Sequence, residues 1–310
     1  MRGVRTLGTH LLQASGFMRP EVVIFDVTHR CTSACAGCAF RDAEPGELPV
    51  SRWVELAREA RALGFAEIVL TGGEPLAHPE IGALLPALAR EAPVSLMTNG
   101  LALRKHADLV RAWVMRVYVS WDAATDDTYA RLRGVRGLSA VRDGVRALEG
   151  HPTHARVTVW AENIGELGAI RDAARAAGCT EMSLLAADTS SGGFGERGEE
   201  RGHAPTSGDI PLLRAFLADT AHDPFIVMSD YAKARLVLLS EGRSEAARCA
   251  APWTSGVVDP TGKWRHCFFL ASSADVSGGL RAAMRAARPG RRELDVAHNP
   301  VCARCVCWRA

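Results

Sequence analysis

Six short apolar segments alternate with segments of helical periodicity along the first two thirds of the chain, and this alternation restricts the possible folds strongly. The apolar segments are EVVIFDV, EIVLT, VSLMTNG, VMRVYVSWD, RVTVW and EMSLLAAD, at residues 21–27, 67–71, 94–100, 114–122, 156–160 and 181–188. Because strands buried on both faces read as apolar runs, the pattern predicts a parallel sheet covered by helices. We therefore expect an α/β fold, a partial (β/α)6 TIM-like barrel with its active site at the carboxyl ends of the strands.

Capping residues mark where three of the intervening helices are expected to begin. Ser51 is expected to cap a helix over residues 52–63, which stops at Gly64. A second helix is expected from Pro79 to Glu91, because proline favours the first helical turn. Asn163 is expected to cap the helix that follows the fifth strand.

Composition agrees with a globular enzyme and excludes several other classes. The 310 residues are 47% apolar, which is enough for one large domain and a small one. The formal charge is +2, and the basic and acidic residues are interspersed, so no nucleic-acid partner is expected. No apolar run approaches the roughly 20 residues that span a bilayer, and MRGVRTLGTH does not resemble a secretory signal. We expect a cytoplasmic protein without a membrane partner, in which thiols stay reduced.

Three cysteines follow the first strand in the run CTSACAGC, namely Cys31, Cys35 and Cys38. Three thiolates are one fewer than the four that complete a cuboidal iron-sulfur cluster, so one iron keeps open coordination positions. An open position indicates chemistry at the metal. A zinc site is the alternative, with His29 and His78 as candidates for a fourth ligand, and a disulfide is disfavoured in a reducing compartment.

The triplet and the segment TGGEP after the second strand together resemble the radical S-adenosylmethionine (radical SAM) superfamily. The resemblance implies that the three cysteines bind a 4Fe-4S cluster whose open iron is chelated by the amino and carboxylate groups of SAM. It also implies that Gly72, Gly73 and Glu74 lie against the methionine amino group. One departure is Gly37, where the family often has an aromatic residue, and Phe40 is a candidate replacement.

Residues that close the third and fourth strands are further candidates. In the resembling family, a serine at the end of strand four and an arginine shortly after it hold the carboxylate and ribose of SAM. Ser120 matches the serine by position, and Arg133 in RLRG is the preferred arginine, with Arg131 as the alternative. Asn99 either lines the site or only shapes the turn before Gly100.

Residues 187–209 are glycine-rich, polar and without apolar periodicity, and they follow the sixth strand. Such a segment is expected to form a long loop over the carboxyl edge of the barrel. Two interpretations stay open, a substrate lid or an excursion without a role.

Five of the nine cysteines come after residue 244: Cys249, Cys267, Cys302, Cys305 and Cys307. The DPTG turn between SGVV and KWRHCF predicts a hairpin that brings the first two thiols toward each other. The pattern resembles the twitch domain, a shortened SPASM extension that holds one auxiliary 4Fe-4S cluster. The resemblance implies that the first four of these cysteines are the ligands and leaves Cys307 over. A four-thiolate zinc site fits the same spacing.

We expect three segments, an N-terminal extension over 1–20, the radical SAM barrel over 21–243 and the twitch domain over 244–310. Cys179, at the start of the sixth strand, is expected to be a packed core residue.

The resemblance implies a radical SAM enzyme that receives electrons from an external reductant such as flavodoxin or ferredoxin. A 5'-deoxyadenosyl radical from SAM would take a hydrogen atom from a polar small molecule, namely a sugar, aminoglycoside or aminocyclitol. Two outcomes stay open, dehydrogenation as in the aminocyclitol dehydrogenases, or epimerisation with Cys307 as hydrogen donor. The Ala, Arg and Gly bias is typical of a GC-rich genome and consistent with antibiotic biosynthesis.

Radical modification of a ribosomal peptide is the enzymatic alternative. Enzymes of that kind often carry a peptide-binding winged-helix domain of roughly eighty residues before the barrel. Only residues 1–20 precede the first strand here, so the small molecule is the preferred expectation. A non-catalytic iron-sulfur electron carrier is the remaining alternative, but a carrier has no use for an open iron beside a SAM-binding segment.

Overall fold

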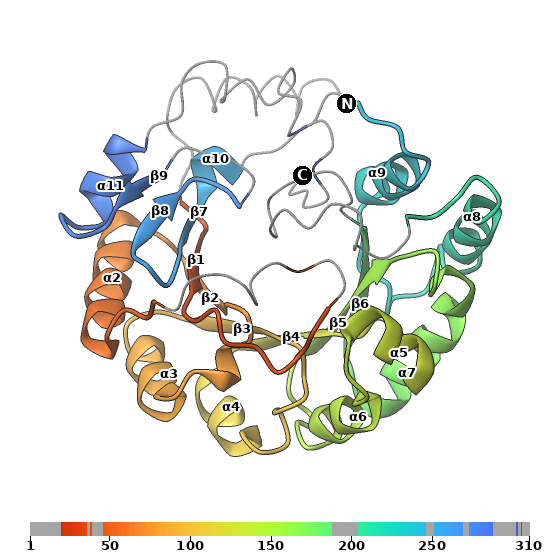
Figure 1. The fold of residues 1–310 in the computed structure, drawn as a ribbon, viewed down its shortest axis with the longest axis horizontal. Helices are drawn as coiled ribbons and strands as arrows, with labels where there is room; N and C mark the ends of the chain where they lie inside the picture. The colour runs from red at the N-terminus through yellow and green to blue at the C-terminus, as the bar shows by residue number, and fades with distance from the viewer. Residues whose placement is uncertain are drawn as a thin grey trace.

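The strands of this chain form one open, curved sheet with helices on its outer side (Figure 1). The computed structural model describes residues 20–35, 38, 46–187, 204–245, 251–268, 273–287, 302 and 305. The strand order is β6-β5-β4-β3-β2-β1-β7-β8-β9. The first six strands are β1 (Val22–Asp26), β2 (Glu67–Thr71), β3 (Val94–Thr98), β4 (Arg116–Ser120), β5 (Thr153–Val159) and β6 (Glu181–Ala186). All neighbours among these six pair in parallel, which confirms the predicted partial barrel.

Helices follow most of these strands and cover one face of the sheet. Their bounds are α2 (Val50–Leu63), α3 (Ile81–Ala89), α4 (Ala107–Trp113), α5 (Asp126–Arg133), α6 (Leu138–Arg146), α7 (Leu167–Ala177), α8 (Ile210–Asp219) and α9 (Asp230–Ser240). Val23 and Phe25 of β1 are fully buried beneath them, and the Phe25 ring lies 5.0 Å from the ring of Trp53 in α2. Since side chains alternate along a strand, Asp26 shares the opposite, inner face of the sheet with Ile24.

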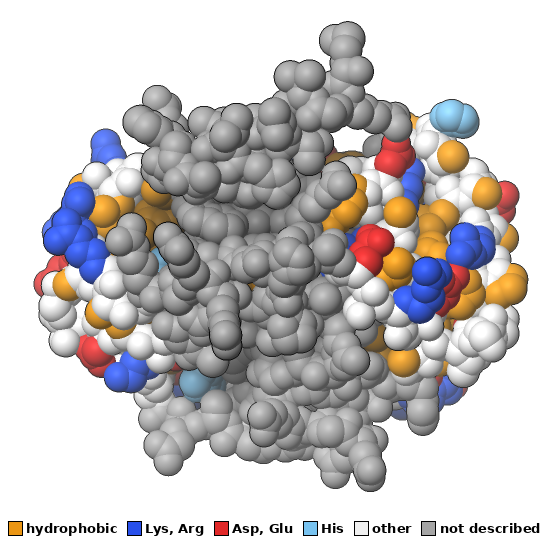
Figure 2. Space-filling model, turned by 90° about the horizontal axis from the view of Figure 1, so that it is seen from above, with side chains coloured by type: hydrophobic (Ala, Val, Ile, Leu, Met, Phe, Trp, Pro, Cys, Tyr) orange, Lys and Arg blue, Asp and Glu red, His pale blue; other side chains and the backbone are white. Residues whose placement is uncertain are grey.

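Two further features of the structure are the distribution of charge on its surface and the length and apolarity of its helices. On the face drawn in Figure 2, basic and acidic side chains are mixed over both flanks, in keeping with the formal charge of +2. None of the helices in the described ranges is both long and apolar enough to cross a membrane.

The starts of α2 and α3 differ from the sequence prediction. Helix α2 begins at Val50, so Ser51 lies inside it and does not cap it, whereas Gly64 ends the helix with φ of 93° as expected. Helix α3 begins at Ile81, because a short 3-10 helix, η2 (Pro75–Ala77), precedes it. The expected start at Pro79 was wrong, since the chain turns twice between β2 and α3.

Asn163 was also wrong as a helix cap, because its side chain is used by neighbouring strand ends. Its amide donates 2.8 Å hydrogen bonds to the carbonyls of Asp122 and Thr158, and its oxygen accepts from the Trp160 N–H at 2.9 Å. The 3-10 helix η3 (Ile164–Glu166) follows, and α7 begins only at Leu167. Asn163 therefore fastens the carboxyl ends of β4 and β5 to each other.

Strands after residue 251 extend the same sheet beyond β1. The short helix α10 (Ala251–Thr254) leads into β7 (Ser255–Val258), which pairs in parallel with β1. Strand β8 (Lys263–Arg265) pairs antiparallel with β7 across the DPTG turn, so the predicted hairpin forms. Strand β9 (Ser273–Asp275) and helix α11 (Leu280–Ala286) complete this part. No sequence pattern indicated that the hairpin would join the barrel sheet. The domain boundary at 244 stays a prediction.

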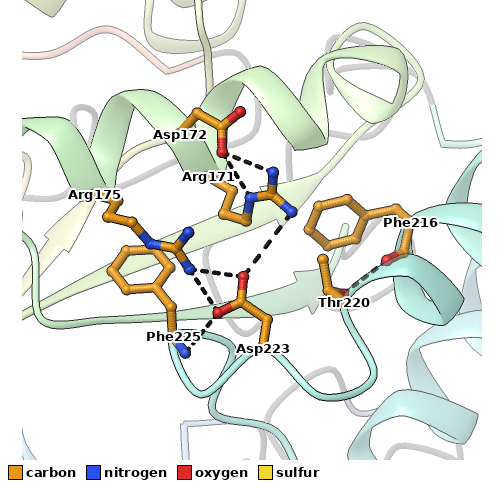
Figure 3. A network of polar contacts seen from close by, with 7 residues as sticks. All are labelled: Arg171, Asp172, Arg175, Phe216, Thr220, Asp223 and Phe225. Carbon is orange, nitrogen blue, oxygen red and sulfur yellow. Dashed lines mark hydrogen bonds and ion pairs between the residues drawn. The ribbon is translucent and has the colours of Figure 1, made fainter.

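A short extended segment covers the other end of the sheet, at β6. Met182 accepts the Val227 N–H at 2.9 Å and donates to the Phe225 carbonyl at 2.7 Å. Asp223 fixes this segment, because it pairs with Arg175 of α7 at 2.6 Å while that guanidinium lies 4.7 Å from the centre of the Phe225 ring (Figure 3). An uncovered strand edge invites pairing with another chain, so this clamp protects β6 and directs the chain into α9.

Candidate active site

The loops that follow β1, β2, β3 and β4 meet at the carboxyl edge of the sheet and are joined there by hydrogen bonds. The loop after β1 carries the three N-terminal cysteines, and the loop after β2 carries the Gly72-Gly73-Glu74 segment. The Gly73 N–H donates to the Thr28 carbonyl at 2.7 Å, and the Glu74 N–H donates to the Arg30 carbonyl at 2.8 Å. The two loops that sequence reasoning assigned to one site are therefore neighbours in the structure.

Gly73 is needed for this close approach of the two loops. A Cβ added at Gly73 would lie 2.5 Å from the Arg30 carbonyl oxygen, which is closer than non-bonded atoms permit. Any side chain at this position would push the segment away from the cysteine loop.

Glu74 is fully buried and binds three donors from its own chain. One carboxylate oxygen accepts from the Thr98 hydroxyl at 2.8 Å and from the Leu76 N–H at 3.0 Å, and the other accepts from the Asn99 N–H at 2.7 Å. Burial raises the pKa of Glu74, and these donors oppose the rise. The carboxylate thus ties the end of β2 to the end of β3, and its oxygens are occupied within the protein.

Asn99 shapes the turn after β3 and also contacts the cysteine loop. Its side-chain oxygen accepts from the Leu101 N–H at 3.0 Å, which shapes the turn after β3. Its amide donates to the Thr32 hydroxyl at 2.9 Å and to Cys31 Sγ at 3.8 Å. A chain of contacts therefore runs from Glu74 through Asn99 to the first cysteine.

The three N-terminal cysteines are half-buried and two of their sulfurs accept hydrogen bonds. Cys31 Sγ accepts from the Ser33 N–H at 3.4 Å, and Cys35 Sγ accepts from Arg133 Nη1 at 3.8 Å. Burial raises the pKa of Cys31, while the Ser33 N–H lowers it. The Cys38 N–H donates to the Cys35 carbonyl at 3.2 Å.

This donor set fits an iron-sulfur cluster. Thiolate ligands are stabilised by such hydrogen bonds, which orient the sulfurs and tune the metal. In the parts of the chain that the structure describes, no three Cys, His, Asp or Glu side chains converge on one metal position. A 4Fe-4S cluster does not need that convergence, because each thiolate ligates a different iron.

Arg133 lies at the site, whereas Arg131 is exposed and donates to Thr128 of its own helix at 3.0 Å. The Arg133 guanidinium forms an ion pair with Asp122, and both side chains are largely buried. Burial raises the pKa of Asp122, and Arg133 opposes that rise. Ser120, the last residue of β4, is half-buried and lies in register with Arg156 of β5.

The carboxyl end of α5 supports the cysteine loop directly. The Ala34 N–H donates to the Arg133 carbonyl at 2.9 Å, and Gly134 lies against the Ala34 carbonyl. Sequence reasoning named Arg133 as a SAM contact but missed its bond to Cys35. The glycine in RLRG could have indicated that a helix ends at this point, since glycine commonly ends helices in the left-handed conformation.

Asp26 is a buried carboxyl group that sequence reasoning missed. It ends β1, is 2% exposed, and its Oδ1 has no hydrogen-bond partner in the described ranges. Burial and, to a smaller extent, the neighbouring Asp259 raise its pKa to about 8, although Arg265 opposes the rise. Asp259 itself pairs with Arg265 at 3.2 Å. A protonated carboxyl group at neutral pH therefore lies where the barrel meets the β7-β8 hairpin.

Asp26→Asn is expected to change how stability depends on pH. The unfolded chain loses this proton near its ordinary pKa of 3.8, whereas the folded chain keeps it up to about 8. Stability of the parent protein should therefore fall as pH rises through this window, by at most roughly 1.4 kcal/mol per pH unit. Because asparagine does not titrate, the Tm advantage of the variant should grow with pH and level off above about 8.

The check is a series of thermal melts of both proteins across this pH window. The exposed Asp172→Asn serves as the control, since its melts should run parallel to those of the parent. Parallel curves for Asp26→Asn as well would contradict the prediction.

Three of the five C-terminal cysteines fall in the described ranges. Cys267 comes two residues after β8, and the Cys305 N–H donates to the Cys302 carbonyl at 3.1 Å. Cys249 and Cys307 lie outside the described residues, as do Gly37, Phe40 and residues 188–203 of the expected loop. The ligand role of Cys249 and the hydrogen-donor role of Cys307 stay predictions. Cys179 is buried in the core, as expected, and burial raises its pKa to about 12.

Comparison with known proteins places this site in a family. Residues 25–170 match the model of the Radical SAM superfamily. The chain is 27% identical over 271 residues to the antilisterial bacteriocin subtilosin biosynthesis protein AlbA of Bacillus subtilis (strain 168), covering 83% of this chain and 58% of that protein. It is 31% identical over 207 residues to the PqqA peptide cyclase of Streptomyces rochei, covering 63% of this chain and 55% of that protein. The chain thus spans between half and three fifths of these relatives' lengths.

A solved structure shows the same fold over nearly the whole chain. Streptococcus suis SuiB bound to precursor peptide SuiA superposes with a TM-score of 0.65 at 14% identity, covering 97% of this chain and 70% of that one. At this identity the likeness shows the fold alone.

The expectation of a sugar, aminoglycoside or aminocyclitol substrate was wrong. The relatives AlbA and PqqA peptide cyclase are named for bacteriocin biosynthesis and peptide cyclisation, not for sugar modification. The expectation relied on the short segment before β1, but the length of that segment does not determine what enters the barrel. The two expected outcomes, epimerisation and dehydrogenation of such a small molecule, depended on this substrate and are therefore wrong as well.

Proposed function

Because residues 25–170 belong to the radical SAM superfamily, we propose that this chain is a radical SAM enzyme that modifies a ribosomally made peptide. The observation that carries the proposal is the match to AlbA, which extends past the radical SAM part to 83% of the chain. The match to a peptide cyclase supports it. Substrate, product and partners of the whole protein are part of this proposal.

Cys31, Cys35 and Cys38 would hold a 4Fe-4S cluster, which with SAM supplies the removal of a hydrogen atom from an unactivated carbon. The chain's own residues orient this site. The Ser33 N–H and the Asn99 amide direct Cys31, and the Arg133 guanidinium directs Cys35. External electrons would come from a reductant such as flavodoxin or ferredoxin.

SAM would lie against Gly72 and Gly73, with Ser120 close to it at the end of β4. Glu74 would contribute through its backbone, since its carboxylate already accepts three hydrogen bonds within the chain. The Arg133 guanidinium already bonds to Asp122 and Cys35. It would therefore contact SAM only through N–H groups that these two bonds do not use. Rigid placement of these groups, with water excluded, is the protein's contribution to the reaction.

A second 4Fe-4S cluster would be held by Cys267, Cys302 and Cys305 together with Cys249. The match to AlbA over most of the chain supports a functional C-terminal part. In this proposal the second cluster would accept the one electron that remains when a peptide has lost one hydrogen atom and one proton and a new bond has closed between the two reacting groups.

The test is anaerobic incubation of the iron-loaded protein with SAM, a strong reductant and the short peptides encoded beside its gene. We expect 5'-deoxyadenosine and a peptide that has lost two hydrogen atoms. The variant Cys31→Ala/Cys35→Ala/Cys38→Ala is the control and should give neither product. Formation of 5'-deoxyadenosine with every peptide mass unchanged would leave the superfamily assignment standing and overturn the peptide substrate.

A further inference from the structure

Arg235 lies in the middle of α9 and is 1% exposed, which is unusual for an arginine. Its Nη2 donates to the Cys302 carbonyl at 2.8 Å, and its Nε donates to the Cys305 carbonyl at 3.4 Å. Burying a guanidinium group is unfavourable unless its N–H groups are hydrogen-bonded. Here the acceptors are the backbone carbonyls of two cysteines in a C-x2-C pair.

The C-x2-C turn is held from two sides by these bonds. The Cys302 carbonyl accepts both the Cys305 N–H, at 3.1 Å, and Arg235 Nη2. The first bond closes the turn locally, and the second fixes the turn against α9. Both cysteines are half-buried rather than packed in the core.

Charge gives Arg235 a second effect on these cysteines. Metal ligation requires thiolates, and a group of thiolates in a partly buried place is stabilised by a nearby fixed cation. Arginine supplies a charge that is not lost at any physiological pH.

The place of α9 in the fold makes this contact long-range. Helix α9 packs against β6 and follows the segment fixed by Asp223, at one end of the open sheet. Cys267 follows β8, near the opposite end. A cluster ligated by Cys267 as well as by Cys302 and Cys305, each through a different iron, would therefore connect the two ends of the sheet, with Arg235 as the anchor on the β6 side.

We propose that Arg235 is a positioning residue of the C-terminal metal site, where it holds Cys302 and Cys305 in a ligating turn and compensates the charge of their thiolates. This inference rests on the second iron-sulfur site of the proposed function. It assigns a role to a buried residue that no cysteine motif contains.

The test uses the full chain in the background Cys31→Ala/Cys35→Ala/Cys38→Ala, so that all bound iron reports on the C-terminal site. Iron and acid-labile sulfide per chain, and the midpoint potential from redox-titrated electron paramagnetic resonance, are measured after a fixed exposure to chelator. Arg235→Met should lower iron affinity by roughly 10-fold to 100-fold, as loss of groups that orient ligands does at other metal sites. Lys233→Met, on the same helix and with no hydrogen bond to either cysteine among the described residues, is the matched control and should keep parental iron.

Arg235→Gln separates the effect of hydrogen bonding from the effect of charge. It is also the variant to test if Arg235→Met does not fold. It keeps a hydrogen-bond donor but loses the charge, so we expect retained iron and a more negative midpoint potential. Parental iron and an unchanged potential in both variants, with only a lower Tm, would show a purely structural role and overturn the inference. Absence of iron from the background protein itself would overturn the second site and this inference together, while the peptide assay remains independent.

Discussion

Gly134→Ala is expected to leave the chain folded but to remove most of the iron from the N-terminal site. Gly134 ends α5 with φ of 67°, and an added Cβ would lie 2.1 Å from the Ala34 carbonyl oxygen. The left-handed conformation costs a non-glycine residue roughly 1–2 kcal/mol, which a domain of this size tolerates. The clash is the larger effect, because Ala34 lies between Cys31 and Cys35 and its displacement moves both sulfurs.

The measurement is iron and SAM binding per folded chain after anaerobic reconstitution, with a Tm for each protein. Gly150→Ala is the matched control, since Gly150 has a similar φ of 78° but no atom within 4 Å of the added Cβ. We expect a small loss of Tm in both variants and loss of iron in Gly134→Ala alone. Equal iron in the two variants would refute the view that α5 positions the cysteine loop.

Glu74→Ala should cause the largest loss of stability among single substitutions at the site. It leaves the buried N–H groups of Leu76 and Asn99 and the Thr98 hydroxyl without their acceptor. Each unsatisfied buried donor costs about 1–3 kcal/mol, so the loss of the acceptor for three donors should lower the free energy of unfolding by at least roughly 3 kcal/mol. Iron affinity should fall too, because Asn99 would no longer hold its amide toward Cys31.

Urea unfolding of the iron-free protein gives the stability change, and reconstitution gives the iron affinity. The control is Glu80→Ala, an exposed carboxylate in the same connection between β2 and α3, which we expect to change neither quantity. If Glu74→Ala lowered stability but bound iron as tightly as the parent, the contact chain through Asn99 would have no part in orienting Cys31.

Local features of the sequence were sufficient for most of the fold. Strands buried on both faces are continuous apolar runs, so all six barrel strands were found, and the DPTG turn predicted the hairpin. Helix starts were harder to predict. A polar side chain that could cap a helix can instead donate a hydrogen bond to an acceptor that is distant in the sequence. Asn163 shows this, since the Asp122 carbonyl, 41 residues away, accepts its amide.

The sequence by itself determined the parallel α/β architecture and the superfamily, because both depend on short segments and their spacing. The cysteine ligands that we propose rest on the same kind of spacing. Tertiary structure decided what surrounds those ligands. Arg133 meets Cys35 across 98 residues, and Arg235 meets Cys302 across 67. Such pairs form only when distant elements are folded together, and burial then fixes which charge and which hydrogen bond each thiol receives.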